Sequence, residues 1–327
     1  MGHYLITGVA GFIASKVAEL LLSEGHTVVG VDNMDNAYDV RLKQWRLAQL
    51  AGRTGFEFCQ LDIMDRQKMR DLWEASKKDR FDALINLAAR AGVRQSVENP
   101  WAYLDTNITG TLNMLELCRE FDVKKFVLAS SSSLYGKDNP MPFREDADTD
   151  YPNSPYAASK KGAEALCYTY HHLYGIDTTI FRYFTVYGPA GRPDMSLFRF
   201  VQWISEGRPV AVYGDGRQSR DFTNVEDIAR GTIAGLRPMD FEIINLGSDK
   251  PVVLMEAIRL IEEIAGRKAR LEFQPLHPSD VPATWADIGK AKRLLGWRPL
   301  VDFKDGVAAL ANWYRENRKW AKEIATN

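Results

Sequence analysis

The chain has 327 residues, of which 45% are hydrophobic and 26% charged, and its formal net charge is -1. These values are ordinary for a globular protein. A net charge so close to zero provides no basic field for nucleic acid and no acidic tail. The length favours two domains, or one α/β domain with a substantial appendage.

The three cysteines, Cys59, Cys118 and Cys167, are odd in number and widely spaced. Neither a disulfide framework nor a metal-ligand spacing is visible, so we expect a reduced setting and no metal site. The longest apolar runs are shorter than a membrane span, and no charged and apolar leader precedes the first expected strand. The sequence therefore predicts a soluble, cytoplasmic protein without membrane attachment.

Short apolar or β-branched runs alternate with longer helical patterns through the first half of the chain. The expected strands lie at residues 3–7, 27–31, 56–60, 83–86, 125–129 and 178–181. The expected helices between them lie at residues 12–24, 65–78, 100–120 and 154–174. Such alternation is typical of an α/β fold with a doubly wound parallel sheet and helices on both faces. We assign residues 1–188 to a nucleotide-binding domain of this class.

The pattern changes after Gly188. Short strands and loops rich in Gly, Pro and Asp separate helical patterns at residues 196–206, 224–236, 255–265 and 303–319. We expect residues 189–327 to form mainly a smaller C-terminal α/β lobe for the substrate. Because no clean linker is present, the chain is expected to cross between the lobes. A ligand would bind in the cleft that they share.

A glycine turn follows the first expected strand, with Gly8, Gly11 and Ala14 at spacings of three. Gly8 permits a tight turn, and Gly11 lets the backbone approach a pyrophosphate, whose charge favours the N-terminus of the next helix. Ala14 is small enough for close packing of helix and strand. Such turns are common, and a turn that serves packing alone is the alternative.

Asp32 ends the second expected strand, 24 residues after Gly8. Its carboxylate can accept hydrogen bonds from both ribose hydroxyls and would repel a 2′-phosphate, so NAD is favoured over NADP. Asp62-Ile63, after the third strand, could contact the adenine, although Asp often caps a helix. Asn86-Leu87-Ala88-Ala89 could form a floor beneath the cofactor, and ordinary strand–helix packing explains it almost as well.

Tyr156 and Lys160 lie four residues apart in an expected helix, which places them on one face. A nearby ammonium stabilises a phenolate and can hold the nicotinamide ribose, so Lys160 would lower the pKa of Tyr156 from its usual value of about 10. Alone, this spacing more often marks an amphipathic helix with a surface lysine. Residues 130–133, all serine, follow the fifth strand, at the edge where open parallel sheets bind ligands.

Together these motifs resemble the extended short-chain dehydrogenase/reductase family over essentially the whole chain. The motifs in family order are Thr7-Gly8-x-x-Gly11-x-x-Ala14, Asp32, Asn86-Leu87-Ala88-Ala89, Asn107-x-x-Gly110-Thr111, the serine run, Tyr156-x-x-x-Lys160 and Arg220-Asp221-Phe222. The resemblance implies tightly held NAD, a nucleotide-sugar substrate, a homodimer, and a catalytic triad of Ser131, Tyr156 and Lys160. The cofactor contacts that it implies are Gly8, Gly11, Phe12, Ile13, Asp32, Asn33, Asp62, Ile63, Leu87, Ala88, Ala89, Asn107, Tyr156, Lys160 and Tyr183.

Residues 36–43, 91–100 and 183–195 resemble the UDP-glucuronate 4-epimerases of this family. The resemblance implies that UDP-glucuronate and UDP-galacturonate are interconverted through a 4-keto sugar, and that NAD is regenerated. It also implies that Arg192 holds the C6 carboxylate, a task that suits a guanidinium fork. The alternative for Arg192 is a loop arginine paired with Asp194. The implied substrate contacts are Gly92, Arg94, Ser132, Ser133, Thr185, Arg192, Tyr213, Arg220 on the diphosphate and Asp280 on the ribose side.

Three other functions stay open. The first is a 4-epimerase for a neutral substrate such as UDP-glucose or UDP-N-acetylglucosamine. A UDP-glucuronate decarboxylase is disfavoured, because no carboxylate stands beside Ser131 in the serine run. A non-catalytic NAD-binding regulator would be expected to have lost Tyr156 or Lys160. Two residues depart from the family pattern: His277 where some relatives use arginine on the phosphate, and Arg90 where an uncharged residue is expected.

Overall fold

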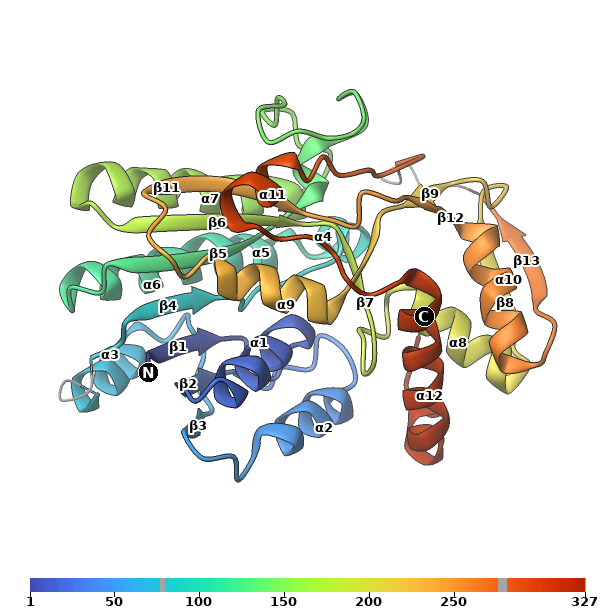
Figure 1. The fold of residues 1–327 in the computed structure, drawn as a ribbon, viewed down its shortest axis with the longest axis horizontal. Helices are drawn as coiled ribbons and strands as arrows, with labels where there is room; N and C mark the ends of the chain where they lie inside the picture. Colours follow the sequence, from blue (N-terminus) through green and yellow to red (C-terminus); the bar gives the residue numbers. More distant parts are fainter. Residues whose placement is uncertain (77–79, 276–280, 327) are drawn as a thin grey trace.

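The computed structural model describes residues 1–76, 80–275 and 281–326 (Figure 1). Its larger lobe is built on a seven-stranded parallel sheet with the order β11-β6-β5-β4-β1-β2-β3. The strands are β1 His3–Thr7, β2 Thr27–Val31, β3 Phe56–Cys59, β4 Ala83–Asn86, β5 Lys125–Ser131, β6 Asp177–Tyr183 and β11 Phe241–Leu246. This confirms the predicted fold class.

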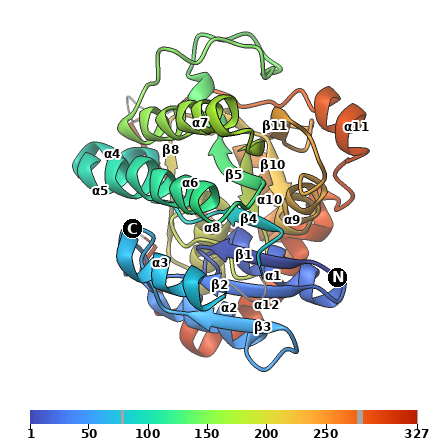
Figure 2. The same ribbon diagram turned by 90° about the vertical axis from the view of Figure 1, so that its left-hand side faces the viewer.

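Helices cover both faces of the sheet, as Figure 2 shows from the end of the molecule. One face carries α1 (Phe12–Ser23), α9 (Val225–Ala234) and α11 (Gly289–Leu295). The opposite face carries α3 (Arg66–Ala75), α6 (Gly110–Glu120) and α7 (Pro155–Tyr174). Neighbouring strand residues therefore face different cores, which is why the central strands β4, β5 and β6 are buried along almost their whole length.

The smaller lobe lies at the carboxyl ends of the strands, on the right of Figure 1. Its helices are α8 Ser196–Glu206, α10 Leu254–Ala265 and α12 Phe303–Ala321. Three two-stranded sheets complete it: β7 Thr185–Tyr187 with β10 Phe222–Asn224, β8 Pro209–Tyr213 with β13 Arg270–Gln274, and β9 Ser219–Arg220 with β12 Val252–Val253. The apolar faces of the three helices form a separate core, which includes Phe198, Ile258 and Trp313.

The chain returns to the larger lobe after residue 188, so a boundary there is only approximate. Helix α9 packs against α1, strand β11 pairs with β6 along its whole length, and α11 packs on β11. Residues 189–327 therefore contribute three elements to the larger lobe, and the predicted division of the chain into two lobes stays a prediction.

The predicted helix at 100–120 is interrupted. It consists of α5 (Pro100–Leu104), a π-helical segment (Asp105–Thr109) and α6. Such π segments often occur at functional sites, and this one carries Asn107. Three of the described helices were not predicted: α2 (Val40–Leu50), α4 (Val93–Glu98) and α11.

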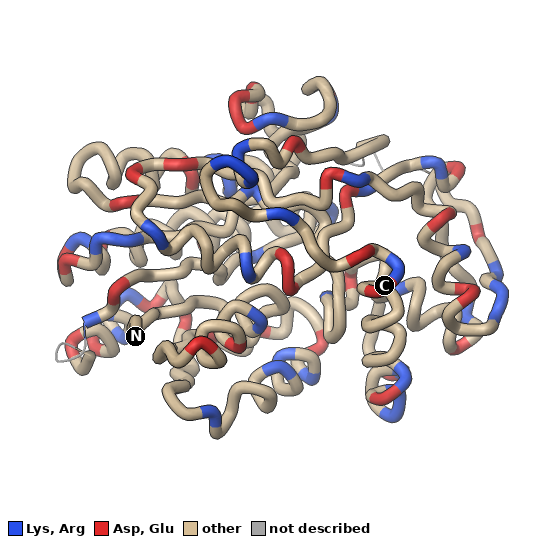
Figure 3. The backbone as a smooth tube through the Cα atoms, viewed as in Figure 1, with Lys and Arg blue, Asp and Glu red and all other residues tan. Residues whose placement is uncertain are grey.

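Basic and acidic residues are interspersed along both lobes in Figure 3, in keeping with the net charge of -1. The electrostatics of the cleft therefore depend on particular side chains rather than on a field of one sign. Among the residues described, no helix combines the length and the apolar character needed to cross a bilayer.

Candidate active site

Two adjoining cavities open at the carboxyl edge of the sheet. The larger has a volume of about 520 Å³ and is lined from both lobes. The smaller, of about 120 Å³, lies at the ends of β1, β2 and β3. Both are lined by Gly8, Gly11, Ala37, Tyr38, Leu87, Ala89 and Arg90. They therefore form one continuous groove, at the edge where open parallel sheets bind ligands.

The glycine turn shapes the middle of this groove. Gly8 has a φ of 72°, and a Cβ there would lie 2.8 Å from backbone atoms of Ala88. A Cβ on Gly11 would lie 2.8 Å from the carbonyl oxygen of Gly8. Helix α1 begins after Gly11 without a side-chain cap, which leaves its first N–H groups available to an anion. The turn fits a pyrophosphate.

Asp32 lies at the smaller cavity, at the end of β2. Its buried carboxylate accepts hydrogen bonds from the backbone N–H of Met34 at 2.8 Å and of Ala10 at 3.2 Å. Lys43, on α2, also donates to it at 3.2 Å. Sequence reasoning missed Lys43, because α2 was not predicted and the pairing depends on how that helix folds back. The ion pair holds Asp32 where a ribose would bind.

The rest of the smaller cavity also agrees with the predicted cofactor contacts. Asp62 accepts hydrogen bonds from the side chain of Asn33 and from the backbone N–H of Met64, both at 2.8 Å. Ile63 and Ala88 also line this cavity. An acidic ribose site, an apolar floor and an uncapped helix N-terminus fit a dinucleotide such as NAD.

Asn107, predicted as a cofactor contact, has a different place. Its side-chain amide donates to the carbonyl of Arg90 at 2.9 Å and to Ser159 Oγ at 2.8 Å, while its oxygen accepts from the backbone N–H of Arg90 at 2.9 Å. It is buried and is not among the residues that line the two cavities. Asn107 is therefore a positioning residue that ties the segment after β4 to α7.

The three predicted catalytic residues line the larger cavity together with Phe12, Ile13 and Tyr183. Helix α7 starts at Pro155 because Ser154 caps it, accepting the N–H of Ala157 at 3.2 Å. Lys160, one turn further, donates to the carbonyl of Ala129 at 2.8 Å. The hydroxyl of Ser131 donates to Ser133 Oγ at 3.1 Å. The hydroxyl of Tyr183 instead bonds Thr232 in the core at 2.8 Å.

Burial dominates the acid–base properties of this group. It lowers the pKa of Lys160 to about 8, against the opposing effect of Glu164. It also raises the pKa of Tyr156, while a hydrogen bond with Ser131 and the charge of Arg192 lower that pKa. The prediction that Lys160 brings the Tyr156 pKa below its usual value is therefore wrong for the protein alone, because desolvation of the phenolate has the largest effect.

A buried polar network supports the catalytic residues from behind. Glu164 on α7 accepts from Ser130 Oγ at 2.5 Å and from Arg182 Nε and Nη2 at 3.0 and 2.8 Å. Arg182 on β6 also donates to the hydroxyl of Tyr135 at 3.1 Å. This network joins α7, β5 and β6, so it fixes the helix of Tyr156 relative to the serine run.

Arg192 reaches the larger cavity from the loop after β7. Its Nε and Nη2 donate to the two carboxylate oxygens of Asp194 at 3.0 and 2.5 Å, and Nη2 also donates to the carbonyl of Ala91 at 3.0 Å. Burial disfavours the charge of Arg192, but the charge of Asp194 outweighs it, and the pKa of Arg192 lies above its usual value. Thus the predicted clamp residue lies in the cavity, and the alternative pairing with Asp194 exists as well.

Four of the other predicted substrate contacts line the same cavity: Gly92, Ser132, Ser133 and Thr185. Arg94, on α4, places its guanidinium 4.1 Å from the ring centroid of Tyr213 on β8, so this contact joins the two lobes. Tyr213, Arg94 and Arg220 are not among the residues that line the two cavities. Arg220 Nη1 donates to the carbonyl of Ser219 at 2.8 Å. Asp280 and His277 lie outside the described residues.

Arg199 on α8 is a further cation that sequence reasoning missed. Burial lowers its pKa, the charge of Asp194 raises it, and the charge of Arg94 lowers it further, so these three groups lie near one another. An arginine among the apolar residues of the segment Leu197–Val201 was the available signal.

The chain matches known proteins along almost its whole length. The family model described as GDP-mannose 4,6 dehydratase matches residues 5–310. UDP-glucuronate 4-epimerase of Thermodesulfobacterium geofontis is 55% identical over 325 residues, which are 99% of each chain.

Solved structures of similar proteins also cover nearly the whole chain. UDP-glucuronic acid 4-epimerase of Bacillus cereus, in complex with UDP-glucuronic acid and NAD, has a TM-score of 0.90 and 35% identity, covering 96% of this chain and 99% of that one. UDP-glucose 4-epimerase of Thermotoga maritima, with UDP-glucose, has a TM-score of 0.89 and 30% identity, covering 97% and 99%. The shared fold thus occurs with both an acidic and a neutral sugar.

Proposed function

Because the chain belongs to the GDP-mannose 4,6 dehydratase family of extended short-chain dehydrogenases/reductases, we propose that it is an NAD-dependent UDP-glucuronate 4-epimerase. The observation that carries this proposal is that Arg192 lies in the same cavity as Tyr156, Lys160 and Ser131. Arg192 supplies a cation for an acidic sugar. The three residues of the catalytic triad supply acid–base chemistry.

Each residue of the catalytic triad has a separate role in proton transfer. Bound NAD would supply the oxidation at C4 by accepting a hydride, and would return it to the opposite face of the sugar. Tyr156 takes the proton of the C4 hydroxyl and gives it back in the second half of the reaction. Ser131 holds the oxygen at C4 and orients Tyr156, with which it shares a hydrogen bond. Lys160 contributes a positive charge beneath the site.

A uronate poses a problem that a neutral sugar does not. Once C4 is a ketone, the sugar is a β-keto acid and is prone to lose carbon dioxide. Loss requires the bond from C5 to the carboxylate to align with the π system of the ketone. Arg192 and Thr185, held on one loop and its preceding strand, would clamp the carboxylate out of that alignment.

The nucleotide end of the substrate is assigned to the lobe interface. Arg94, Arg199 and Tyr213 bring two cations and an aromatic ring together there. We assign the diphosphate to the two arginines and the uracil to Tyr213, with Arg220 as a further contact; Asp280, predicted on the ribose side, lies outside the described residues. The tail of the substrate would then join α4 to β8.

The experiment that tests this function compares Arg192→Gln with wild type on UDP-glucuronate and on UDP-glucose. Loss of a buried, hydrogen-bonded charge partner corresponds to about 2–5 kcal/mol, so kcat/KM for UDP-glucuronate should fall by about 30-fold or more. UDP-pentose should also appear. Arg144→Gln, which removes an exposed partner of Asp146, is the matched control. Unchanged turnover of UDP-glucuronate with no pentose would contradict the proposal.

A second candidate is a 4-epimerase for a neutral UDP-hexose. It is favoured by the bidentate pairing of Arg192 with Asp194, because that carboxylate already occupies one edge of the guanidinium. A C6 carboxylate must then approach through Nη1 or displace Asp194. The same assay separates the candidates: this alternative predicts that wild type prefers UDP-glucose.

We further propose a cytoplasmic homodimer. The cytoplasmic location is supported by three cysteines that form no disulfide, two of them buried. The dimer is supported by large apolar side chains exposed on α5 and α7, namely Trp101 at 72%, Tyr168 at 56% and Leu173 at 59%. If light scattering of the purified protein gives the molar mass of a monomer, the dimer is excluded.

A further inference from the structure

Arg90 forms an ion pair that links the segments after two strands of the sheet. Its Nη2 lies 3.0 Å from Oδ2 of Asp35, and the two side chains are 30% and 25% exposed. Arg90 follows β4, and Asp35 follows β2. Because β4 and β2 are the two neighbours of β1, this pair passes across the carboxyl end of β1.

The pair lies where the two cavities meet. Arg90 lines both cavities, and Asp35 lines the smaller one. Gly8 and Gly11 of the turn also line both. The ribose site at Asp32 is therefore on one side of the ion pair and the catalytic residues are on the other. A dinucleotide that fills both cavities has its pyrophosphate at this junction.

Hydrogen bonds that involve backbone groups hold both residues of the ion pair in place. The N–H and carbonyl of Arg90 are bonded to the side chain of Asn107, each at 2.9 Å. The carboxylate of Asp35 accepts the N–H of Ala37 at 2.7 Å, and the N–H of Asp35 donates to Asn33 Oδ1 at 3.0 Å. A contact between such anchored residues costs little additional ordering when it forms.

We propose that Arg90 and Asp35 form a strap over the pyrophosphate of the bound cofactor and slow its release. Arg90 adds a positive charge next to two phosphates, and Asp35 keeps that charge over the groove instead of letting the side chain extend into solvent. The strap has to open before the cofactor can leave. This inference rests on the NAD site of the proposed function and is independent of the sugar.

The test measures how fast NAD leaves the protein as purified, with no sugar added. Protein preloaded with NAD is mixed with an excess of an NAD-consuming enzyme, and the bound NAD that remains is followed with time. Asp35→Asn and Arg90→Gln should each release NAD about two- to fivefold faster, the range for an ion pair near the surface. High salt should accelerate release from wild type more than from either variant.

Asp35→Asn is the decisive variant, because the strap and a simple charge attraction predict opposite results for it. Removing a carboxylate beside two phosphates would slow release if only charge mattered. Release from Asp35→Asn at the wild-type rate, or more slowly, therefore overturns the strap.

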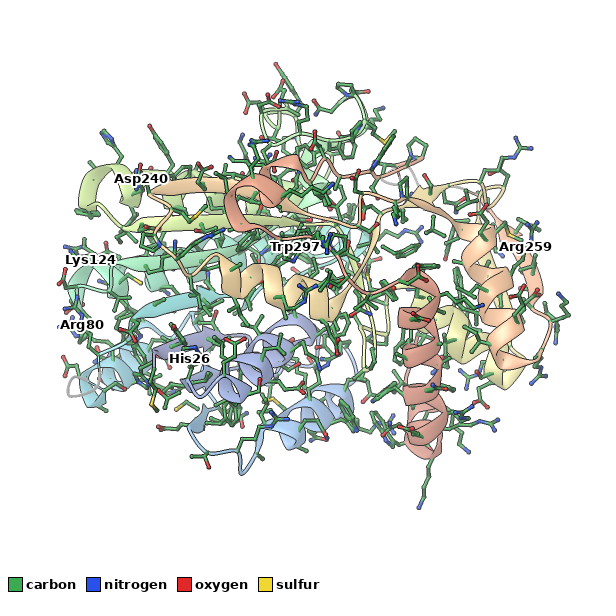
Figure 4. The ribbon with its side chains drawn as sticks, viewed as in Figure 1. His26, Arg80, Lys124, Asp240, Arg259 and Trp297 are labelled. Carbon is green, nitrogen blue, oxygen red and sulfur yellow. The ribbon has the colours of Figure 1, made fainter. Side chains whose placement is uncertain are left out.

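Arg80→Gln is the matched control. Arg80 Nη2 lies 2.6 Å from Asp122 Oδ2 in an exposed ion pair. Figure 4 shows Arg80 at the end of the molecule opposite the smaller lobe, away from the carboxyl ends of the strands. Arg80→Gln should release NAD at the wild-type rate. If its release is accelerated as much as that of the Asp35 and Arg90 variants, the proposal is overturned as well. Because no sugar takes part, a failure to epimerise UDP-glucuronate leaves this result unaffected.

Discussion

Lys160 places a positive charge beneath Tyr156, and the burial of this charge lowers the stability of the protein. It is almost fully buried between α7 and β5, where its ammonium donates to the carbonyl of Ala129. Burial makes the charged form expensive and lowers the pKa of the side chain to about 8. The protein therefore loses stability at neutral pH in order to keep a cation beneath Tyr156.

This cost predicts a pH dependence of stability. In the unfolded chain Lys160 titrates near its usual value of about 10.4, so between pH 8 and that value the unfolded state binds more protons than the folded one. Stability must then rise with pH in this window. From pH 7 to pH 9.5, the free energy of unfolding of wild type should increase by about 2 kcal/mol relative to Lys160→Met. Urea titrations of both proteins, freed of NAD, measure the difference, and equal changes would contradict a depressed pKa.

Sequence spacing predicted the residues that share an element, and missed those that meet only in the fold. Tyr156 and Lys160 follow from helical periodicity, and the serine run follows from its place after a strand. The ion pair of Lys43 with Asp32 spans 11 residues and two elements, and α2 had to be known first. Asn107 was recognised as part of the site, but its role as a positioning residue depends on three hydrogen bonds that no spacing reveals.

The turn between β1 and α1 is the element on which cofactor binding depends most. Gly8 has a positive φ, and its Cα lies so close to the segment after β4 that a Cβ would meet the backbone of Ala88 at 2.8 Å. Gly25, after α1, has a φ of 82° but nothing within 4 Å of the position of its Cβ. Both glycines therefore have a backbone conformation that is strained for other residues. Only at Gly8 would an added Cβ also meet neighbouring atoms.

Replacing each glycine with alanine separates these two effects. Gly25→Ala should lower the free energy of unfolding by about 1–2 kcal/mol, the cost of the left-handed conformation. Gly8→Ala should lower it by a further 1–3 kcal/mol or so, because rigid backbone has to move, and should also weaken NAD binding. Urea unfolding and titration with NAD measure the two quantities. Equal losses of stability would contradict close packing at Gly8.

Element types were predictable wherever periodicity was long and regular. The strands of the first half and helices α7, α8, α9, α10 and α12 lie within a few residues of their predicted bounds. The π-helical segment was not predictable, because its local pattern continues that of the helices on either side. Short strands were predicted after residue 188 without bounds, and β11 could not be placed in the main sheet, since its six residues lie far in sequence from the strand with which it pairs.

Arg46 joins the turn after β1 to the loop after β7. This buried arginine, on α2, donates to the carbonyl of Ala190 at 3.0 and 2.7 Å and to the carbonyl of Ala10 at 3.1 Å. Ala190 has a φ of 53°, a strained conformation for alanine. Arg46 therefore holds the strained loop that carries Arg192 against the turn that binds the cofactor.

Loss of Arg46 should affect both stability and substrate selectivity. In Arg46→Met the carbonyls lose their donors, which should lower the free energy of unfolding by about 2–4 kcal/mol. The KM for UDP-glucuronate should rise more than kcat falls, because the loop of Arg192 is released while the catalytic triad stays in place. Arg53→Met, in an exposed pair with Glu19, should change stability by no more than about 0.5 kcal/mol. Urea unfolding and steady-state kinetics provide the measurements. A wild-type KM in Arg46→Met would contradict the link between the lobes.

At the scale of the whole molecule, one groove holds NAD tightly through the reaction and presents an acidic UDP-sugar to Tyr156. The most direct measurement incubates the purified protein with UDP-glucuronate, without added NAD, and follows the sugars by NMR. We expect UDP-galacturonate to accumulate to a constant ratio, with no net NADH and no UDP-pentose. Unchanged UDP-glucuronate under conditions in which UDP-glucose is epimerised, or conversion to a UDP-pentose, would contradict it.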